Sequence, residues 1–211
     1  MKVTIVYDNT SARDDLEADW GFSALVTAHG RRLLFDTGAK GSILLGNMEK
    51  LDIDPRSVEE ILISHDHWDH TGGLSDILEI NPVPVYIPKS ASGPSGLSEV
   101  IRVDEAVKIH EGIYSTGELE KIEQSLVVEV DGGVAVIVGC SHSGIGNIIR
   151  AAQRFGPVKA LIGGYHGFDE FEAVEGIDLL VPTHCTQFKS ELKSRYPGAY
   201  REGGAGRVFE L

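Results

Sequence analysis

The densest group of chemically active side chains in this sequence lies in one short stretch, residues 64–70. It holds three histidines and two aspartates directly after an apolar run that is typical of a buried strand. Imidazoles and carboxylates beside a core need partners, and a divalent cation satisfies several of them at once. Because residues two apart in extended backbone point the same way, His65 and His67 can bind one ion. A following turn would aim Asp69 and His70 at a second position nearby. The stretch therefore predicts a metal site, with a solvated polar loop as the alternative.

Two further histidines follow buried strands elsewhere in the chain. His142 comes after the apolar run 134–138, in a loop of small residues that leaves room for an ion. His184 comes after the apolar run 179–181. Loops at one edge of a sandwich can bring ligands from distant positions together. We therefore expect His142 to complete the first metal position and His184 the second.

A third histidine, His166, lies after the apolar run 158–162 and between glycines. It could reach the metals or donate a proton to a leaving group, and a structural role is the alternative. We take His166 as a candidate catalytic residue together with Asp69, which we expect to orient the nucleophile. His29 and His110 have the contexts of surface residues.

The remaining sequence predicts the elements that position these loops. Two hairpins are expected at 22–35 and 126–138, and helical periodicity occurs at 40–51, 145–155 and 187–196. Two similar passes of hairpin, polar loop and β-α-β unit favour an α/β fold with two half-sheets packed face to face. Helices would cover the outer faces, giving a four-layer α/β/β/α sandwich.

Two loops have compositions that suggest a place near a site. The acidic stretch 14–20 is typical of a solvated loop, although it could also fold over a site with Trp20 as an apolar lid. The stretch 88–96, rich in proline, glycine and serine, could border a substrate entrance.

The order His-x-His-x-Asp-His after a strand resembles the signature of the metallo-β-lactamase superfamily. The likeness extends from 36–38 (Asp-Thr-Gly) to 183–185 (Thr-His-Cys). It implies one domain of the metallo-β-lactamase-like sandwich fold over residues 1–211, with two divalent ions in one binuclear site. It also implies that Asp36 supports the metal loop through hydrogen bonds without binding metal.

Cys140 stands where the sequence departs from many two-metal members of the superfamily. Those members carry Gly-Asp, and the aspartate bridges both ions, where this chain has Gly139-Cys140. A hydroxide or the substrate would then have to bridge the ions, unless Cys140 itself does so. We place Cys140 next to the ligands and leave the identity of the bridge open.

A narrower group within the superfamily shares further motifs with this chain, and it is associated with a pterin-linked synthase of methanopterin-type biosynthesis. The shared motifs lie at 20–25, 34–38, 47–48, 139–148, 163–166 and 184–186. The chain departs from this group at Gln187, where the others carry glycine.

Composition limits the partners. The net charge of −13 and the lack of a Lys/Arg-rich run argue against nucleic-acid binding. No run approaches membrane-spanning length, and the start of the sequence has no signal-peptide pattern. Two cysteines, Cys140 and Cys185, fit a reducing compartment. We expect a cytoplasmic protein without membrane partners, for which a homo-oligomer is compatible with the sequence.

These features together predict a metal-dependent hydrolase. A metal held by neutral imidazoles lowers the pKa of its water and can deliver hydroxide at pH 7. The expected substrate is a small anionic molecule, such as a phosphoester or a lactone. Zinc is the expected metal, with iron and manganese as alternatives because imidazole and carboxylate suit all three. The alternative functions are the pterin-linked synthase or transferase and, from another class, a di-iron redox protein or a non-catalytic metal-binding protein.

Overall fold

Two β-sheets form the centre of the molecule. The computed structural model describes residues 1–93 and 99–211. The seven-stranded sheet has the order β13 (Val208–Glu210), β1 (Lys2–Tyr7), β2 (Ser23–Ala28), β3 (Arg31–Phe35), β4 (Glu60–Leu62), β5 (Val85–Pro88) and β6 (Val100–Val103). The six-stranded sheet has the order β12 (Leu179–Thr183), β11 (Val158–Gly164), β10 (Gly133–Val138), β9 (Leu126–Val130), β8 (Ile113–Ser115) and β7 (Val107–His110).

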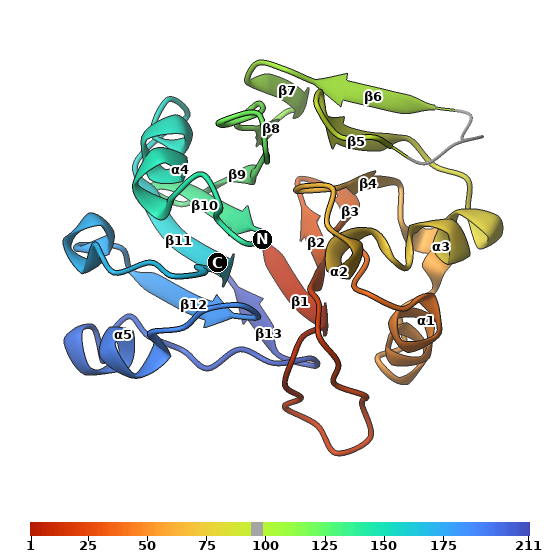
Figure 1. Ribbon diagram of the computed structural model, residues 1–211, viewed down its shortest axis with the longest axis horizontal. Helices are drawn as coiled ribbons and strands as arrows, with labels where there is room; N and C mark the ends of the chain where they lie inside the picture. Colours follow the sequence, from red (N-terminus) through yellow and green to blue (C-terminus); the bar gives the residue numbers. More distant parts are fainter. Residues whose placement is uncertain (94–98) are drawn as a thin grey trace.

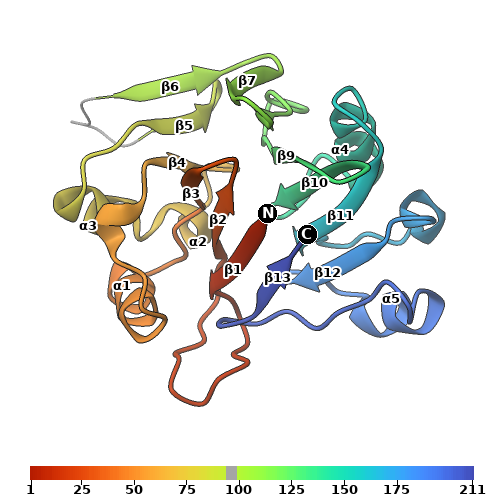
Figure 2. The ribbon, with the colours of Figure 1, turned by 180° about the vertical axis from the view of Figure 1, so that it is seen from behind.

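Helices cover the outer faces of both sheets. Figures 1 and 2 show α1 and α3 outside the seven-stranded sheet, and α4 and α5 outside the six-stranded sheet. The helices are α1 (Gly41–Lys50), α2 (Trp68–Thr71), α3 (Leu74–Ile80), α4 (Ile145–Ala152) and α5 (Lys189–Arg195), with 3₁₀ turns η1 (Pro55–Ser57) and η2 (Phe171–Val174). This arrangement confirms the predicted four-layer α/β/β/α sandwich.

Three apolar clusters hold the layers together, and alternation along each strand divides its side chains between them. Val3 and Ile5 of β1 pack between the two sheets, in one cluster with Ile137 of β10. Val6 and Tyr7 belong to the outer cluster under α1, because the strand register shifts between residues 5 and 7. A third cluster joins the six-stranded sheet to α4 and α5. Each fully buried aliphatic side chain stabilises the fold by about 1.5–3 kcal/mol.

Most predicted elements are present, with shifted ends. Both hairpins form, since β2 pairs antiparallel with β3 and β9 pairs antiparallel with β10. The helix expected at 145–155 ends at Ala152. The edge strand β6 was not predicted, because only Val103 of its four residues is buried and the alternation is weak. Of the loop expected at 88–96, residues 94–96 lie outside the described part of the chain.

The site-bearing loops meet at one edge of the sandwich because the strands before them are parallel. β3 pairs parallel with β4, and β10, β11 and β12 form parallel pairs in turn. Four non-glycine residues just after these strands have left-handed backbone: Asp36 (φ 55°), Ser141 (59°), His166 (47°) and His184 (47°). Such backbone is costly and concentrates at functional sites. These turns end the strands abruptly and aim the following side chains across the edge. Within residues 1–93 and 99–211, no helix is both long and apolar enough for a membrane crossing.

Candidate metal centre

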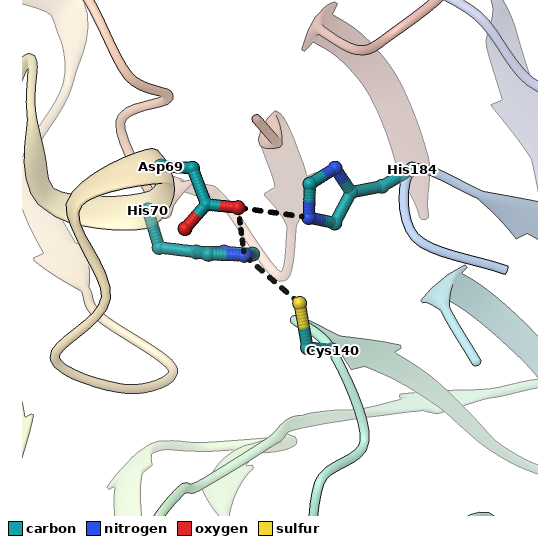
Figure 3. A group of neighbouring side chains, drawn as sticks. All are labelled: Asp69, His70, Cys140 and His184. Carbon is teal, nitrogen blue, oxygen red and sulfur yellow. Dashed lines mark hydrogen bonds and ion pairs between the residues drawn. The ribbon is translucent and has the colours of Figure 1, made fainter. Parts of the chain in front are cut away.

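Four buried side chains from separate parts of the sequence converge in one cluster (Figure 3). Asp69 and His70 come from α2, Cys140 follows β10, and His184 follows β12; one ligand atom of each lies within 4.8 Å of the others. Asp69 Oδ2 is 3.3 Å from His184 Nε2 and 3.8 Å from His70 Nε2. The Sγ atom of Cys140 is 3.2 Å from His70 Nε2. Two imidazoles, a carboxylate and a thiol form a donor set suited to zinc or iron.

A second group of possible ligands lies directly beside the first. His65, Cys140 and His142 also offer atoms within 4.8 Å of one another. His67 is exposed and completes this group, with its Nδ1 3.0 Å from His65 Nε2 and its ring centre 4.9 Å from that of His142. The ring centres of His65 and His70 are 4.2 Å apart, so the two groups are neighbours. Cys140 belongs to both groups and therefore lies between them.

The surroundings and the protonation of several of these side chains suit the binding of a cation. The Nε2 atoms of His142 and His184 are buried and have no hydrogen-bond partner among the described residues, an arrangement that is costly without a ligand. Burial, together with neighbouring imidazoles, lowers the pKa of His65, His70 and His142. These rings are therefore neutral at pH 7, which is the form that binds metal.

The two acidic groups of the cluster differ in protonation. Burial alone would raise the pKa of Asp69, but its contacts with the His184 and His70 imidazoles bring that pKa below its usual range. Asp69 is thus a carboxylate. A hydrogen bond with Cys185 and burial raise the pKa of the Cys140 thiol. Neither cysteine forms a disulfide. Because its pKa is raised, the Cys140 thiol would lose its proton only when a cation binds.

Hydrogen bonds to Asp36 orient the metal loop. The buried Asp36 carboxylate accepts from the Ser64 backbone N–H and from Ser64 Oγ, each at 2.7 Å, and pairs with His70 Nδ1 at 2.7 Å. With its Nδ1–H donated to Asp36, His70 directs a bare Nε2 toward Asp69 and Cys140. Ser64 Oγ also lies 2.8 Å from His65 Nδ1, which leaves His65 Nε2 facing His67.

A pocket of about 420 Å³ opens beside the group that contains His65 and His142. His166 is exposed at its wall, and the His166 ring centre is 4.9 Å from that of His142. The start of α4, including Gly146, forms another part of the wall. Arg150 and Glu170 also line the pocket, and both approach Gly146. This pocket is large enough for the body of a small molecule whose reacting group lies over the histidines.

The structure brings together every residue expected to bind metal, although metal binding itself stays a prediction. Of the two histidines predicted at the surface, His29 is exposed, whereas His110 is partly buried and pairs with Glu60 at 2.6 Å. Sequence reasoning missed Asn9, whose Oδ1 lies 2.9 Å from His184 Nδ1. It offered Trp20 only as an apolar lid, whereas Trp20 Nε1 donates to Asp69 Oδ2 at 2.9 Å. The only available signal for these two contacts was the position of the loop directly after the first strand.

Comparison with known proteins decides the family. Residues 20–162, which are more than half of the chain, match the metallo-beta-lactamase superfamily. The chain belongs to the metallo-β-lactamase superfamily. This confirms the resemblance seen in the sequence, and the superfamily usually binds metal ions.

Individual proteins resemble the chain over nearly its full length. The 7,8-dihydropterin-6-methyl-4-(beta-D-ribofuranosyl)-aminobenzene-5′-phosphate synthase of Methanocaldococcus jannaschii is 25% identical over 89% of this chain and 88% of its own. The crystal structure of Tm1679, a metal-dependent hydrolase of the beta-lactamase superfamily, superposes with a TM-score of 0.82 and 28% identity, covering 100% of this chain and 99% of its own. Zn²⁺-bound PqqB from Methylobacterium extorquens, at 12% identity and a TM-score of 0.69, shares the fold and covers 100% of both chains. Family and relatives support an enzyme.

Proposed function

We propose that this chain is a metal-dependent hydrolase that uses two divalent ions to cleave a small anionic substrate, with phosphoesters as the first choice and lactones as the second. The proposed ligands are His65, His67 and His142 at the first position, Asp69, His70 and His184 at the second, and Cys140 between them. The observation that carries the proposal is the pair of adjacent ligand groups next to an open pocket. Zinc is the proposed metal, because nitrogen and sulfur ligands together favour it over manganese.

The chemistry divides between the ions and the side chains. Bound divalent ions would lower the pKa of water to near neutrality and offset negative charge on a phosphate or a developing oxyanion. The Asp69 carboxylate, ionised and held between His184 and His70, orients the nucleophile and accepts a hydrogen bond from it. His166, exposed at the pocket wall, donates a proton to the leaving group.

The charge of the protein does not exclude an anionic substrate. Most of the net charge of −13 lies on surface carboxylates, whose effect is screened beyond about 8–10 Å at physiological salt. At the centre the ions would dominate, whereas along the pocket the positive charge of Arg150 is offset by Asp169 and Glu170. The ions themselves would therefore favour an anion over the histidines.

A second candidate is a pterin-linked synthase, and the observation that favours it is the name of the M. jannaschii relative. In such a reaction the same ions would act as Lewis acids on a phosphate-type leaving group. The hydrolase comes first because Tm1679, at 28% identity, is described as a metal-dependent hydrolase.

Metal analysis and a substrate panel would test the proposal. Purified protein would be assayed for zinc, iron and manganese, and then with phosphomonoesters, phosphodiesters and lactones. Asp69→Ala should lower kcat by about 10²–10⁴-fold, as expected for loss of a positioned acid–base group. Asp66→Ala is the matched control: Asp66 is exposed in the same loop, and its carboxylate accepts only from Ser92 N among the described residues.

The outcomes separate the alternatives. Turnover of one panel class with zinc present, lost in Asp69→Ala and kept in Asp66→Ala, supports the hydrolase. Iron without turnover of any panel member contradicts it and favours a redox protein. Intact metal binding without turnover favours a binding protein or the synthase, for which pterin substrates would then be assayed.

A further inference from the structure

The segment between β1 and β2, residues 8–21, contacts the candidate centre at two of its ligands. We call this segment the N-terminal loop. Most of it is exposed, as the acidic composition predicts, but its two ends reach the edge of the sandwich. Asn9, near one end, contacts His184, and Trp20, near the other, contacts Asp69. Both of these ligands belong to the proposed second position.

The contacts of Asn9 fix the form of the His184 ring. The Gly21 backbone N–H donates to Asn9 Oδ1 at 3.0 Å, and Asn9 Nδ2 donates to the His184 carbonyl at 3.2 Å. These two bonds identify the amide oxygen, which can only accept. His184 Nδ1, 2.9 Å from that oxygen, must therefore carry the proton. The bare Nε2 then faces Asp69, and the His184 backbone N–H is held by Asp8 Oδ1 at 2.8 Å.

Trp20 orients the other ligand. An indole N–H can only donate, so the 2.9 Å bond from Trp20 Nε1 requires Asp69 Oδ2 to accept. This is the same oxygen that faces His184 Nε2 and His70 Nε2. The Trp20 ring also packs on the His184 ring, with centres 5.3 Å apart. Trp20 therefore positions both ligands at once.

The loop is anchored to the fold, which makes it a rigid support. The Asn47 side chain, buried on α1, accepts from Glu17 N and donates to Glu17 O and to Val6 O. Lys40 pairs with Asp19 at 2.7 Å, next to Trp20. Within the described residues, no hydrogen bond, ion pair or ring contact joins the loop to His65, His67 or His142.

We propose that the N-terminal loop controls occupancy of the second metal position, with Asn9 and Trp20 as positioning residues for His184 and Asp69. The inference rests on the two-metal centre proposed above. Groups that fix the orientation of a metal ligand typically change metal affinity by about 10–100-fold when they are removed. The effect should be confined to one of two metal equivalents, because the loop touches only one of the two ligand groups.

Calorimetric zinc titration of the metal-free protein would test this proposal. Asn9→Leu should weaken one equivalent by about 10–100-fold and leave the other unchanged, whereas Asn9→Asp, which keeps the acceptor, should retain wild-type affinity. Trp20→Phe keeps a ring against His184 but lacks the N–H, and it should weaken the same equivalent by about tenfold. Ser11→Ala is the control, because Ser11 Oγ bonds only to backbone atoms in the described residues.

A second readout needs no metal. Nitrogen-15 chemical shifts of the histidine rings in the metal-free protein should show the Nδ1–H form for His184 in the wild type and in Ser11→Ala. In Asn9→Leu that preference should be lost. Equal weakening of both equivalents, or unchanged affinities with an unchanged His184 form, would overturn the role of the loop. A wild type that binds fewer than two equivalents would instead contradict the two-metal centre itself.

Discussion

The two proposed metal positions differ in burial and in support. At the second position Asp69, His70 and His184 are each at most 7% exposed, and partners outside the centre hold every one of them. At the first position His65 is buried and contacts Ser64 Oγ, but His67 is exposed and His142 is half-buried, beside His166 and the open pocket. This contrast indicates a division of roles, in which the second position is fixed by the fold and the first faces the substrate.

The largest effect should come from removing the support that both positions share. Asp36→Ala would leave the Ser64 N–H and His70 Nδ1 unpaired in a fully buried place, and Ser64 Oγ would keep only His65 Nδ1 as a partner. We expect the free energy of unfolding of the metal-free protein to fall by about 3–5 kcal/mol. Urea denaturation measures this, with the exposed Asp66→Ala as control. If Asp36→Ala lowers the free energy of unfolding by less than Asp66→Ala does, Asp36 is not a structural support.

The next effect tests whether Cys140 belongs to both positions. Cys140→Ser should weaken both zinc equivalents by about tenfold or more and should remove thiolate-to-metal charge-transfer absorption from the cobalt-substituted protein. Cys185→Ser, which changes the neighbouring thiol, should keep that absorption. If Cys140→Ser leaves the cobalt spectrum unchanged, the thiol supports the centre without binding metal.

The proposed role of His166 as a proton donor, on the open side of the first position, can be tested with substrates that differ in their leaving group. His166→Gln should lower kcat by about 10²-fold for a phosphoester with an alkyl leaving group, because His166 then no longer supplies the proton. A 4-nitrophenyl ester, whose leaving group needs no proton, should be affected only slightly. Metal content should not change. Equal losses for both esters would assign His166 a structural role.

The last prediction concerns pH, where the effect of each ring on its own is small. In the metal-free protein the pKa values of the buried His65 and His70 are lowered, so these rings stay neutral when the unfolded chain takes up protons. Stability is therefore complete above the ordinary imidazole pKa of about 6.5 and falls as the pH drops below it. Each ring should remove about 1.4 kcal/mol per pH unit in that range. Urea titrations between pH 7.5 and pH 5 measure the slope, and a stability that rises toward pH 5 would contradict neutral buried rings.

Part of this centre could be predicted from the sequence because its signals are local. The His-x-His-x-Asp-His stretch follows an apolar strand, and His142 and His184 each follow another. Alternating apolar residues predict both hairpins, and the family resemblance adds the layer order. Helix ends were less accurate, since the apolar period continues past Ala152 where α4 ends.

The contacts that complete the centre depend on packing between distant segments. Asn9 and His184 are 175 residues apart, and no periodicity near Asn9 indicates a ligand support. The bond from Trp20 to Asp69 likewise exists only because the N-terminal loop returns to the strand edge. Cys140 was expected beside the ligands, but its place in both groups follows from where β10 ends.

Anomalous diffraction at the zinc edge from crystals of the zinc-loaded protein would locate the metal ions themselves. We expect two peaks per chain, one bound by His65, His67 and His142 and the other by Asp69, His70 and His184. A single peak, or zinc bound away from these six side chains, would contradict it.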